Sequence, residues 1–407
     1  MRLVPTLLAT ALAFGPVASS AFAQAGMSHE HAAAPAAGIR TPTVAFDGQG
    51  RLWRAWVDGD AVFVGRSPDM GRTFPHPVRV TAAPEDIDAN GESRPKIAIG
   101  PRGGIYVSWT RYGSKPYTGD IRFTRSLDDG ATFDPPRTIN DDGLETGHRF
   151  DALDVGPDGA IYLAWIDKRD LEHATAAGVE YAGAALYYTV SRDRGATFAA
   201  NRKIKDHICE CCRIAHAFDR EGRLTLFWRD VMTGSIRDHA MVRLTADGLA
   251  TSVSRVTADN WEIAACPHHG PGLAFGSLGI AHIVWFTGAG PQGPGAFYGR
   301  LSAAGHLVGT PVRLGTAKPS TGHAVVAAEG DTVTVAWKEG DSRGAVVRVM
   351  RSTNGGASFG PAVTLAQTGG DSDHPFLVEG PDGLLLSWYT SAEGYRLLPA
   401  AGTRGTP

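Results

Sequence analysis

A tryptophan recurs at intervals of 51 to 63 residues along most of this 407-residue chain, and this repeat is the strongest constraint on the fold. Each tryptophan ends an apolar segment that follows a turn such as Gly-Pro-Asp-Gly. A third apolar segment and a Ser/Asp/Gly turn complete the unit. The seven positions are Trp56, Trp109, Trp165, Trp228, Trp285, Trp337 and Trp388. One small sheet cannot bury both of its faces alone, so successive units must pack against each other.

Repeats of this length, with about four strands each, are typical of propeller blades. The 51 glycines and 25 prolines are spread along the chain, which favours short strands joined by tight turns. Seven tryptophan units predict an all-β, seven-bladed β-propeller. The last unit, residues 374–400, has room for only three strands, so the segment near Ile39 is a candidate to complete the ring.

A second signature follows the third strand of four units, and we call these segments the S-x-D turns. They fit the pattern S-x-D/N-x-G-x-T/S-F and are Ser67–Phe74, Ser126–Phe133, Ser191–Phe198 and Ser352–Phe359. The Asp or Asn is expected to bond backbone amides, and the glycine to supply a positive φ. Units four and five keep only remnants, at residues 243–249 and 300–306.

The S-x-D turns resemble the Asp-box (BNR) repeat of the sialidase superfamily, and the resemblance covers the chain from about Ile39 to its end. Known sialidase domains have six blades, so a six-bladed sialidase-type propeller with one irregular repeat is the alternative. The family uses three arginines, a Tyr/Glu pair and an Asp. Ile39-Arg40-Thr41-Pro42 resembles the run that holds its first arginine, which implies a catalytic role for Arg40.

The remaining sialidase residues cannot be matched. Arg94, Arg149 and Arg229 are candidates for a second arginine, but none lies in a family-like context. No Tyr/Glu pair can be assigned from Glu180-Tyr181 or from the late tyrosines, which are Tyr389 and Tyr395. The fold is therefore supported more strongly than the activity.

The chain begins with a pattern typical of a secretory signal peptide, predicted over residues 1–23. Arg2 precedes an apolar run, and Ala21-Phe22-Ala23 fits a cleavage site. Residues 24–38, with Met27, His29 and His31, are predicted to be a disordered tether, and the propeller to occupy residues 39–407. We therefore expect a periplasmic or secreted protein.

Charge and hydropathy exclude several kinds of partner. Lys and Arg number 39 against 42 Asp and Glu, for a net charge of −3, and the two signs are interspersed. This composition gives no reason to expect nucleic acid, and no second apolar stretch is long enough for a membrane span. The partner that we expect is a metal ion or small ligand at the channel mouth; a protein partner cannot be named.

All four cysteines fall within 58 residues of one another, in the runs HICECC and CPHHGP. Aligning the units by turn and tryptophan places cysteines and histidines from units four to seven at one level, the entrance to each innermost strand. In a propeller these entrances surround the channel mouth. The predicted metal ligands are Cys209, Cys211, Cys212, Cys266, His268, His269, His323 and His374, with His148 nearby.

Thiolate and imidazole ligands suit copper or zinc. In an oxidising compartment, however, the cysteines could instead form disulfides, and Cys209 and Cys266 occupy equivalent places in adjacent units. Three hypotheses remain open: a propeller that binds a transition metal, most plausibly copper; a sialidase-type exo-glycosidase; and a binding scaffold with structural disulfides. Arg213 could serve an anionic ligand, and Trp261 is expected mainly to pack.

Overall fold

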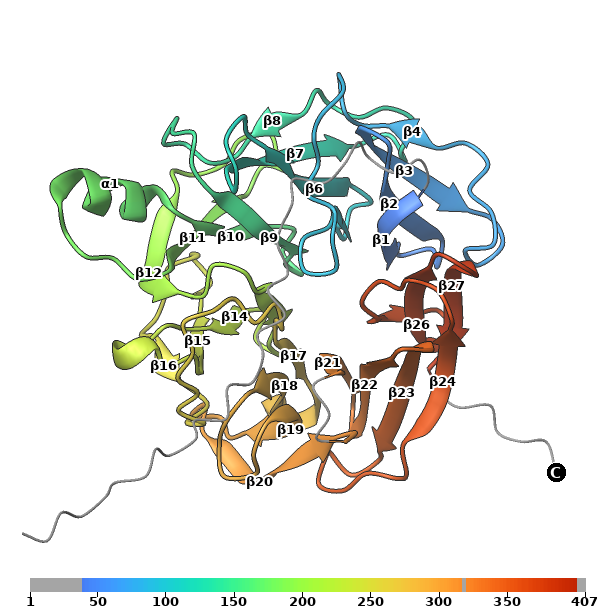
Figure 1. Cartoon of the computed structure of the whole chain (residues 1–407). Helices are drawn as coiled ribbons and strands as arrows, with labels where there is room; N and C mark the ends of the chain where they lie inside the picture. The colour runs from blue at the N-terminus through green and yellow to red at the C-terminus, as the bar shows by residue number, and fades with distance from the viewer. Residues whose placement is uncertain (1–38, 317–319, 401–407) are drawn as a thin grey trace, which may run out of the picture. The chain divides into compact units, whose positions relative to one another are not determined.

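The computed structural model describes residues 39–316 and 320–400, which form seven antiparallel sheets arranged in a ring (Figure 1). The predicted signal peptide and tether, including Met27, His29 and His31, lie outside the described residues, as do residues 401–407.

Each blade is a meander of consecutive strands, numbered from the innermost outward. Blade one contains β1 (Ile39–Phe46), β2 (Leu52–Asp58), β3 (Ala61–Ser67) and β4 (Val78–Arg79). Blade two contains β5 (Lys96–Ile99), β6 (Ile105–Tyr112), β7 (Gly119–Ser126) and β8 (Arg137–Thr138). Blade three contains β9 (His148–Val155), β10 (Ile161–Asp167), β11 (Ala184–Ser191) and β12 (Arg202–Ile208), with helix α1 (Arg169–Ala177) between β10 and β11.

The cysteine runs precede blades four and five. Blade four contains β13 (Ala215–Phe218), β14 (Leu224–Arg229), β15 (His239–Arg243) and β16 (Ser254–Arg255), and a 3-10 turn, η1 (Thr233–Ser235). Blade five contains β17 (Gly272–Phe275), β18 (Ala281–Thr287), β19 (Gly295–Leu301) and β20 (Leu307–Leu314), and the turn η2 (Ser277–Gly279). Blade six contains β21 (Thr321–Glu329), β22 (Thr332–Asp341), β23 (Gly344–Ser352) and β24 (Val363–Thr368). Blade seven contains β25 (Phe376–Gly380), β26 (Gly383–Thr390) and β27 (Gly394–Pro399).

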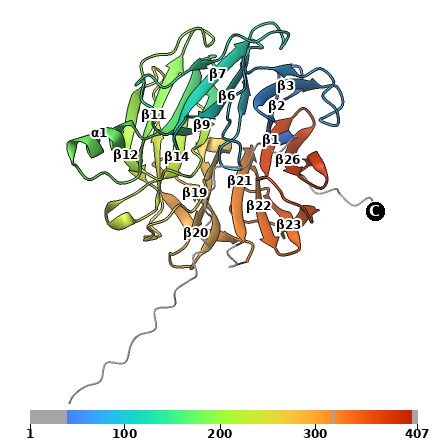
Figure 2. The same cartoon turned by 45° about the horizontal axis from the view of Figure 1, so that its top comes forward.

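The innermost strands follow one another around the axis of the ring, as Figures 1 and 2 show. Each contacts the next, from β1 through β25, and β25 contacts β1 again. The seven-bladed prediction is therefore confirmed, and the six-bladed alternative is wrong. The segment at Ile39 does not complete blade seven, because β1 pairs with β2 of its own blade.

The repeated tryptophans lie at equivalent places, on the second strand of every blade, and each is at most 4% exposed. Five indole nitrogens donate to a carboxylate, as Trp165 does to Asp167 Oδ2 at 2.8 Å, and Trp388 donates to the carbonyl of Asp373 at 2.9 Å. A buried indole N–H needs such a partner, so these bonds fix the ring orientation between blades.

The S-x-D turns share one hydrogen-bond pattern. In blade two, Ser126 Oγ accepts from the amide of Gly130 at 3.0 Å, and Asp128 Oδ1 accepts from the amide of Thr132 at 3.0 Å. Gly130 has φ of 77°, as the turn chemistry predicts. A Cβ on Gly130 would lie 2.6 Å from Trp53, so the glycine also lets the turn pack against the preceding blade.

The same packing closes the ring between blades seven and one. The turn of blade one brings Phe74 to 6.4 Å from the ring of Tyr395 on β27. The buried guanidinium of Arg54 lies between them, 3.7 Å from the Phe74 ring centroid and 5.3 Å from that of Tyr395. Side-chain packing, with no shared strand, therefore joins the first and last blades.

Strand register defines two faces of the ring. In blade three, the first residue of β9, His148, pairs with Asp167 at the end of β10, whereas the S-x-D turn begins at Ser191, opposite Ile161 and hence Val155. The innermost strands therefore begin on one face, which we call the mouth face, and the S-x-D turns lie on the opposite face. In the part of the chain described here, no helix has the length and hydropathy needed to cross a membrane.

Candidate metal centre at the mouth face

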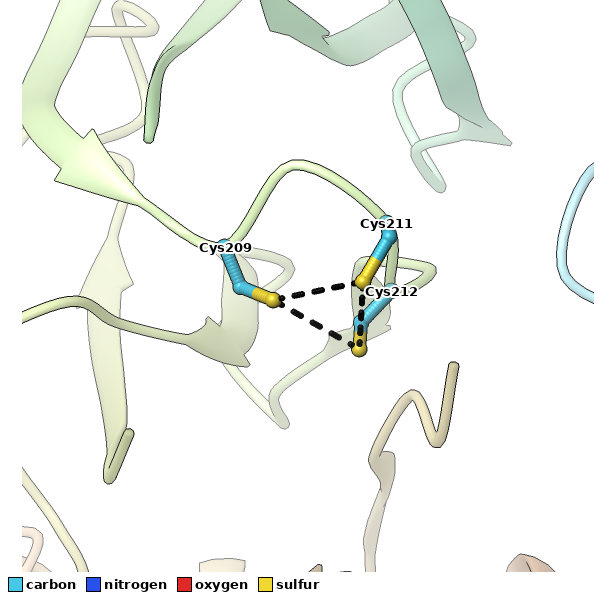
Figure 3. A group of neighbouring side chains, drawn as sticks. All are labelled: Cys209, Cys211 and Cys212. Atoms are coloured by element: carbon cyan, nitrogen blue, oxygen red, sulfur yellow. Dashed lines mark hydrogen bonds between the residues drawn. The ribbon is translucent and has the colours of Figure 1, made fainter. Parts of the chain in front are cut away.

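Three cysteine thiols meet where β12 ends and blade four begins (Figure 3). The backbone amide of Cys209 donates to the carbonyl of Arg229 at 3.0 Å, which holds this turn against β14. The Sγ atom of Cys209 lies 3.6 Å from that of Cys211 and 3.8 Å from that of Cys212, and the last two are 3.9 Å apart. All three residues are at most 3% exposed. We call this group the inner triad.

The spacing of the inner triad matches that of metal ligands. Around a tetrahedral ion with metal–sulfur bonds of about 2.3 Å, neighbouring sulfurs stand about 3.8 Å apart. A disulfide requires about 2.05 Å instead. All four cysteines are free in the structure, and the alternative pairing of Cys209 with Cys266 is not formed.

The sulfurs of the inner triad shift one another's pKa. The neighbouring thiols of Cys211 and Cys212, with smaller contributions from Arg229 and Arg237, hold the pKa of Cys209 well below its usual range. Burial, with the neighbouring Cys209, raises the pKa of Cys212 to about 12. A lowered pKa favours the thiolate form of Cys209, and thiolate is the form that binds metals.

A second donor group lies beside the triad and shares Cys211 with it. The donor atoms of Cys211, Cys266 and His268 lie within 4.8 Å of one another. Cys266 is exposed, and His268 is half-buried with φ of 52°, a strained conformation for a non-glycine residue. We call this group the outer half-site.

The remaining predicted histidines form a separate stack. The ring of His269 lies 4.5 Å from that of His323, which lies 3.5 Å from that of His374, and Phe286 covers the free face of His269 at 4.1 Å. Burial lowers the pKa of His269 to about 3, and those of His323 and His374 to about 4. Neutral rings can stack in this way without charge repulsion.

Glu92, which the sequence did not single out, connects four blades beneath this stack. It comes from the loop before β5 and is 3% exposed. Its carboxylate accepts from the amides of Arg213 and Gly270 at 2.9 and 3.0 Å, and Oε1 accepts from Arg213 Nη1 at 2.9 Å. The Nδ1 atoms of His323 and His374 lie 3.5 and 3.4 Å from Oε1.

Burial opposes ionisation of Glu92, but Arg213 and the two histidines outweigh it and hold its pKa well below the usual range. The eight predicted ligands therefore form two neighbouring groups instead of one donor set. The thiols and His268 belong to one, and the three stacked imidazoles with Glu92 belong to the other.

Other arginines on this face pair with acids that the sequence also left unassigned. Arg94 pairs with Asp373, across the ring closure. Arg149 Nη2 lies 2.6 Å from Asp88 Oδ2, and the Tyr112 hydroxyl donates to the other oxygen of Asp88 at 2.7 Å.

Arg40 donates to the Gly59 carbonyl of its own blade at 3.1 Å, so its sialidase role stays a prediction. Among the tyrosines considered for that role, Tyr181 donates to Asp206 at 2.8 Å and Tyr395 packs at the ring closure.

Two further residues have structural partners. His148 is fully buried, with Nδ1 2.8 Å from the Gly119 carbonyl and Nε2 3.0 Å from Asp142 Oδ2, apart from the thiols. Trp261 packs at 5.2 Å against the guanidinium of Arg229, as the packing interpretation expected.

Comparisons with known proteins bear on the fold. No protein-family model and no curated protein matches this sequence. A polysaccharide lyase PL25-ulvanlyase superposes with a TM-score of 0.56 at 12% identity, over 89% of this chain and 94% of that one. A second polysaccharide lyase gives 0.54 at 10% identity, over 93% and 92%. A Hadza microbial sialidase gives 0.49 at 13% identity, over 86% and 72%. At these identities the likeness is one of fold.

Proposed function

We propose that this protein is an exported propeller that binds a thiophilic metal ion at the inner triad. The observation that carries the proposal is three buried cysteines, contributed by a single tight turn, with Sγ atoms 3.6 to 3.9 Å apart. Buried cysteines with this spacing and no disulfide favour a ligand set over a staple.

Copper(I) is the ion that we favour, and zinc is the alternative. Soft thiolates select both ions, and three sulfurs alone suit copper(I), whereas zinc almost always takes four ligands in structural sites. A fourth ligand for zinc would come from Cys266 or His268, on the exposed side. The buried guanidinium of Arg229 offsets part of the negative charge that three thiolates would bring.

A second candidate is an enzyme acting on acidic polysaccharides. The propeller that this chain shares with two polysaccharide lyases supports it, together with Tyr112 and Arg149 around Asp88 on the mouth face. Against it, Glu92 and Arg94 are buried and already paired, so they offer no free charge to a substrate. Depolymerisation of ulvan and cleavage of a fluorogenic sialoside by the pure protein test this candidate.

The metal proposal is tested by replacing Cys211 and Cys212 together with Ser. Wild-type protein produced in the periplasm should carry copper or zinc by elemental analysis, and added metal should raise its melting temperature. The double variant should stay folded but lose at least about a hundredfold in affinity, or about 2.7 kcal/mol, because two of three thiolates are gone.

Circular dichroism of the metal-free variant controls for folding. If wild-type protein contains no metal, and its melting temperature ignores Cu(I), Cu(II) and Zn(II), the proposal is wrong.

A further inference from the structure

We propose that the outer half-site is a port through which the metal ion passes between the inner triad and a soluble thiol-bearing donor or acceptor. This inference depends on the proposed metal function and adds the route by which the metal ion enters or leaves the inner triad. A purely structural site would be closed on all sides, whereas this one continues into an exposed thiol and imidazole.

The shared sulfur is the first observation. Cys211 belongs to both groups, because its Sγ lies 3.6 and 3.9 Å from the other triad sulfurs and within 4.8 Å of the donors of Cys266 and His268. An ion can therefore change ligands one at a time without leaving Cys211, and it never needs to be released as a bare ion.

The difference in solvent exposure between the two groups shows on which side an external ligand can approach. The triad cysteines are at most 3% exposed, whereas Cys266 is exposed and His268 is half-buried. An incoming thiolate can reach Cys266 from solvent, but it cannot reach Cys209 or Cys212 directly.

The two groups also differ in how the backbone holds them. The triad turn is held by Cys209, whose amide bonds the Arg229 carbonyl, and by Arg213, which bonds Glu92. Residues 264–268 lie outside the strands, and within this segment the exposed Cys266 Sγ lies 3.8 Å from Glu210 Oε1. The inner ligands are thus anchored to β14 and to Glu92, whereas the outer ligands lie in a loop.

The transfer is a ligand exchange with no change of oxidation state. Bonds from the ion to the sulfurs of Cys209 and Cys212 break, and bonds to the sulfur of Cys266 and a ring nitrogen of His268 form, while the Cys211 bond persists. The outgoing thiolates take up protons, and the incoming Cys266 thiol releases one. External thiolates then replace Cys266, His268 and finally Cys211 one after another, and the two cysteine thiolates that leave take up protons from solvent.

The test separates binding from transfer. Wild-type protein, Cys266→Ser and His268→Ala would each be loaded with Cu(I) without oxygen, and transfer to bicinchoninate followed by stopped-flow absorbance. Both variants should still hold one Cu(I) per chain but transfer it roughly ten- to a hundredfold more slowly, the range that lost supporting contacts cost at metal sites. His306→Ala, which removes an exposed histidine elsewhere on blade five, should transfer at the wild-type rate.

Three results would each contradict either the metal function or the port, and the experiment distinguishes them. Failure of wild-type protein to hold Cu(I), Cu(II) or Zn(II) defeats the metal function itself. Unchanged transfer rates in Cys266→Ser and His268→Ala defeat the port and leave the metal function standing. Loss of Cu(I) binding in Cys266→Ser shows that Cys266 is an essential ligand of a closed site, which also defeats the port.

Discussion

The two faces of the ring are built on different principles. On the face opposite the mouth, four blades carry the same S-x-D turn with the same hydrogen bonds, and each turn packs on the blade before it. On the mouth face the contacts run between blades: Glu92 accepts hydrogen bonds from residues of blades four and five and approaches imidazoles from blades six and seven. The repeated turns stabilise the fold, whereas residues that are not part of the repeat form the candidate site.

Blades four and five differ from the other blades on both faces of the ring. They have only remnants of the S-x-D turn, and the loops that lead into them carry all four cysteines. In blade four, Thr245 Oγ1 still accepts from the amide of Leu249 at 3.0 Å, so a simpler turn is enough to finish the hairpin. These two blades therefore carry remnant turns on one face and the thiols on the other.

Glu92→Gln should disrupt the contacts that join blades four to seven on the mouth face. Among the substitutions proposed here, we expect it to lower the free energy of unfolding most. It would leave the Arg213 side chain, which is only 11% exposed, without its carboxylate, and this costs about 3 kcal/mol. Urea denaturation measures the loss. Asp158→Asn, at an exposed ion pair with Arg192, is the matched control and should cost less than about 1 kcal/mol. Equal losses for both substitutions would mean that the network adds nothing beyond a surface pair.

The histidine stack should make the mouth face sensitive to acid. The folded pKa of His374 is about 4, below the ordinary 6.5, so above pH 6.5 the ring is neutral in both states. As pH falls from 6.5 towards 4, the unfolded chain binds a proton that the folded chain does not, and stability falls by up to about 3 kcal/mol. His374→Gln in metal-free protein should remove that part of the pH dependence.

Urea denaturation at pH 7 and pH 4.5 gives the comparison. Parallel losses in wild-type protein and His374→Gln would contradict a neutral buried imidazole at this position.

Ser126→Ala tests the repeated face and should have a smaller effect on stability than Glu92→Gln or the acid titration of His374. It leaves the buried amide of Gly130 without an acceptor, which costs about 1 to 2 kcal/mol. Thr245→Ala, at the remnant turn of blade four, should cost about half as much because that turn is more exposed. Metal affinity should be unchanged in both variants, and a change would show that the two faces are coupled.

The repeat made the fold predictable from the sequence, because spacing and turn chemistry are local properties. The tryptophans all lie on second strands, and the S-x-D turns form the expected bonds. Blade number followed from counting units, and only the closure near Ile39 was misplaced, since β1 pairs within its own blade. How the first and last blades meet depends on side-chain packing between them, which the sequence of one repeat unit does not reveal.

The site was only partly predictable. Aligning units gives the level of a residue along the axis, and it placed the cysteines and histidines on the mouth face. It does not give how far a side chain reaches across the ring, so it could not separate the inner triad from the histidine stack. Glu92 was missed for the same reason, because its partners belong to other blades.

The ring closure has an evolutionary consequence. Every described sheet consists of strands consecutive in sequence, and the first and last blades meet through Arg54, Phe74 and Tyr395 without exchanging a strand. Duplication or loss of one gene segment could therefore add or remove a whole blade without re-pairing any other. The circumference of such a ring can change by one whole blade at a time, because no blade lends a strand to another.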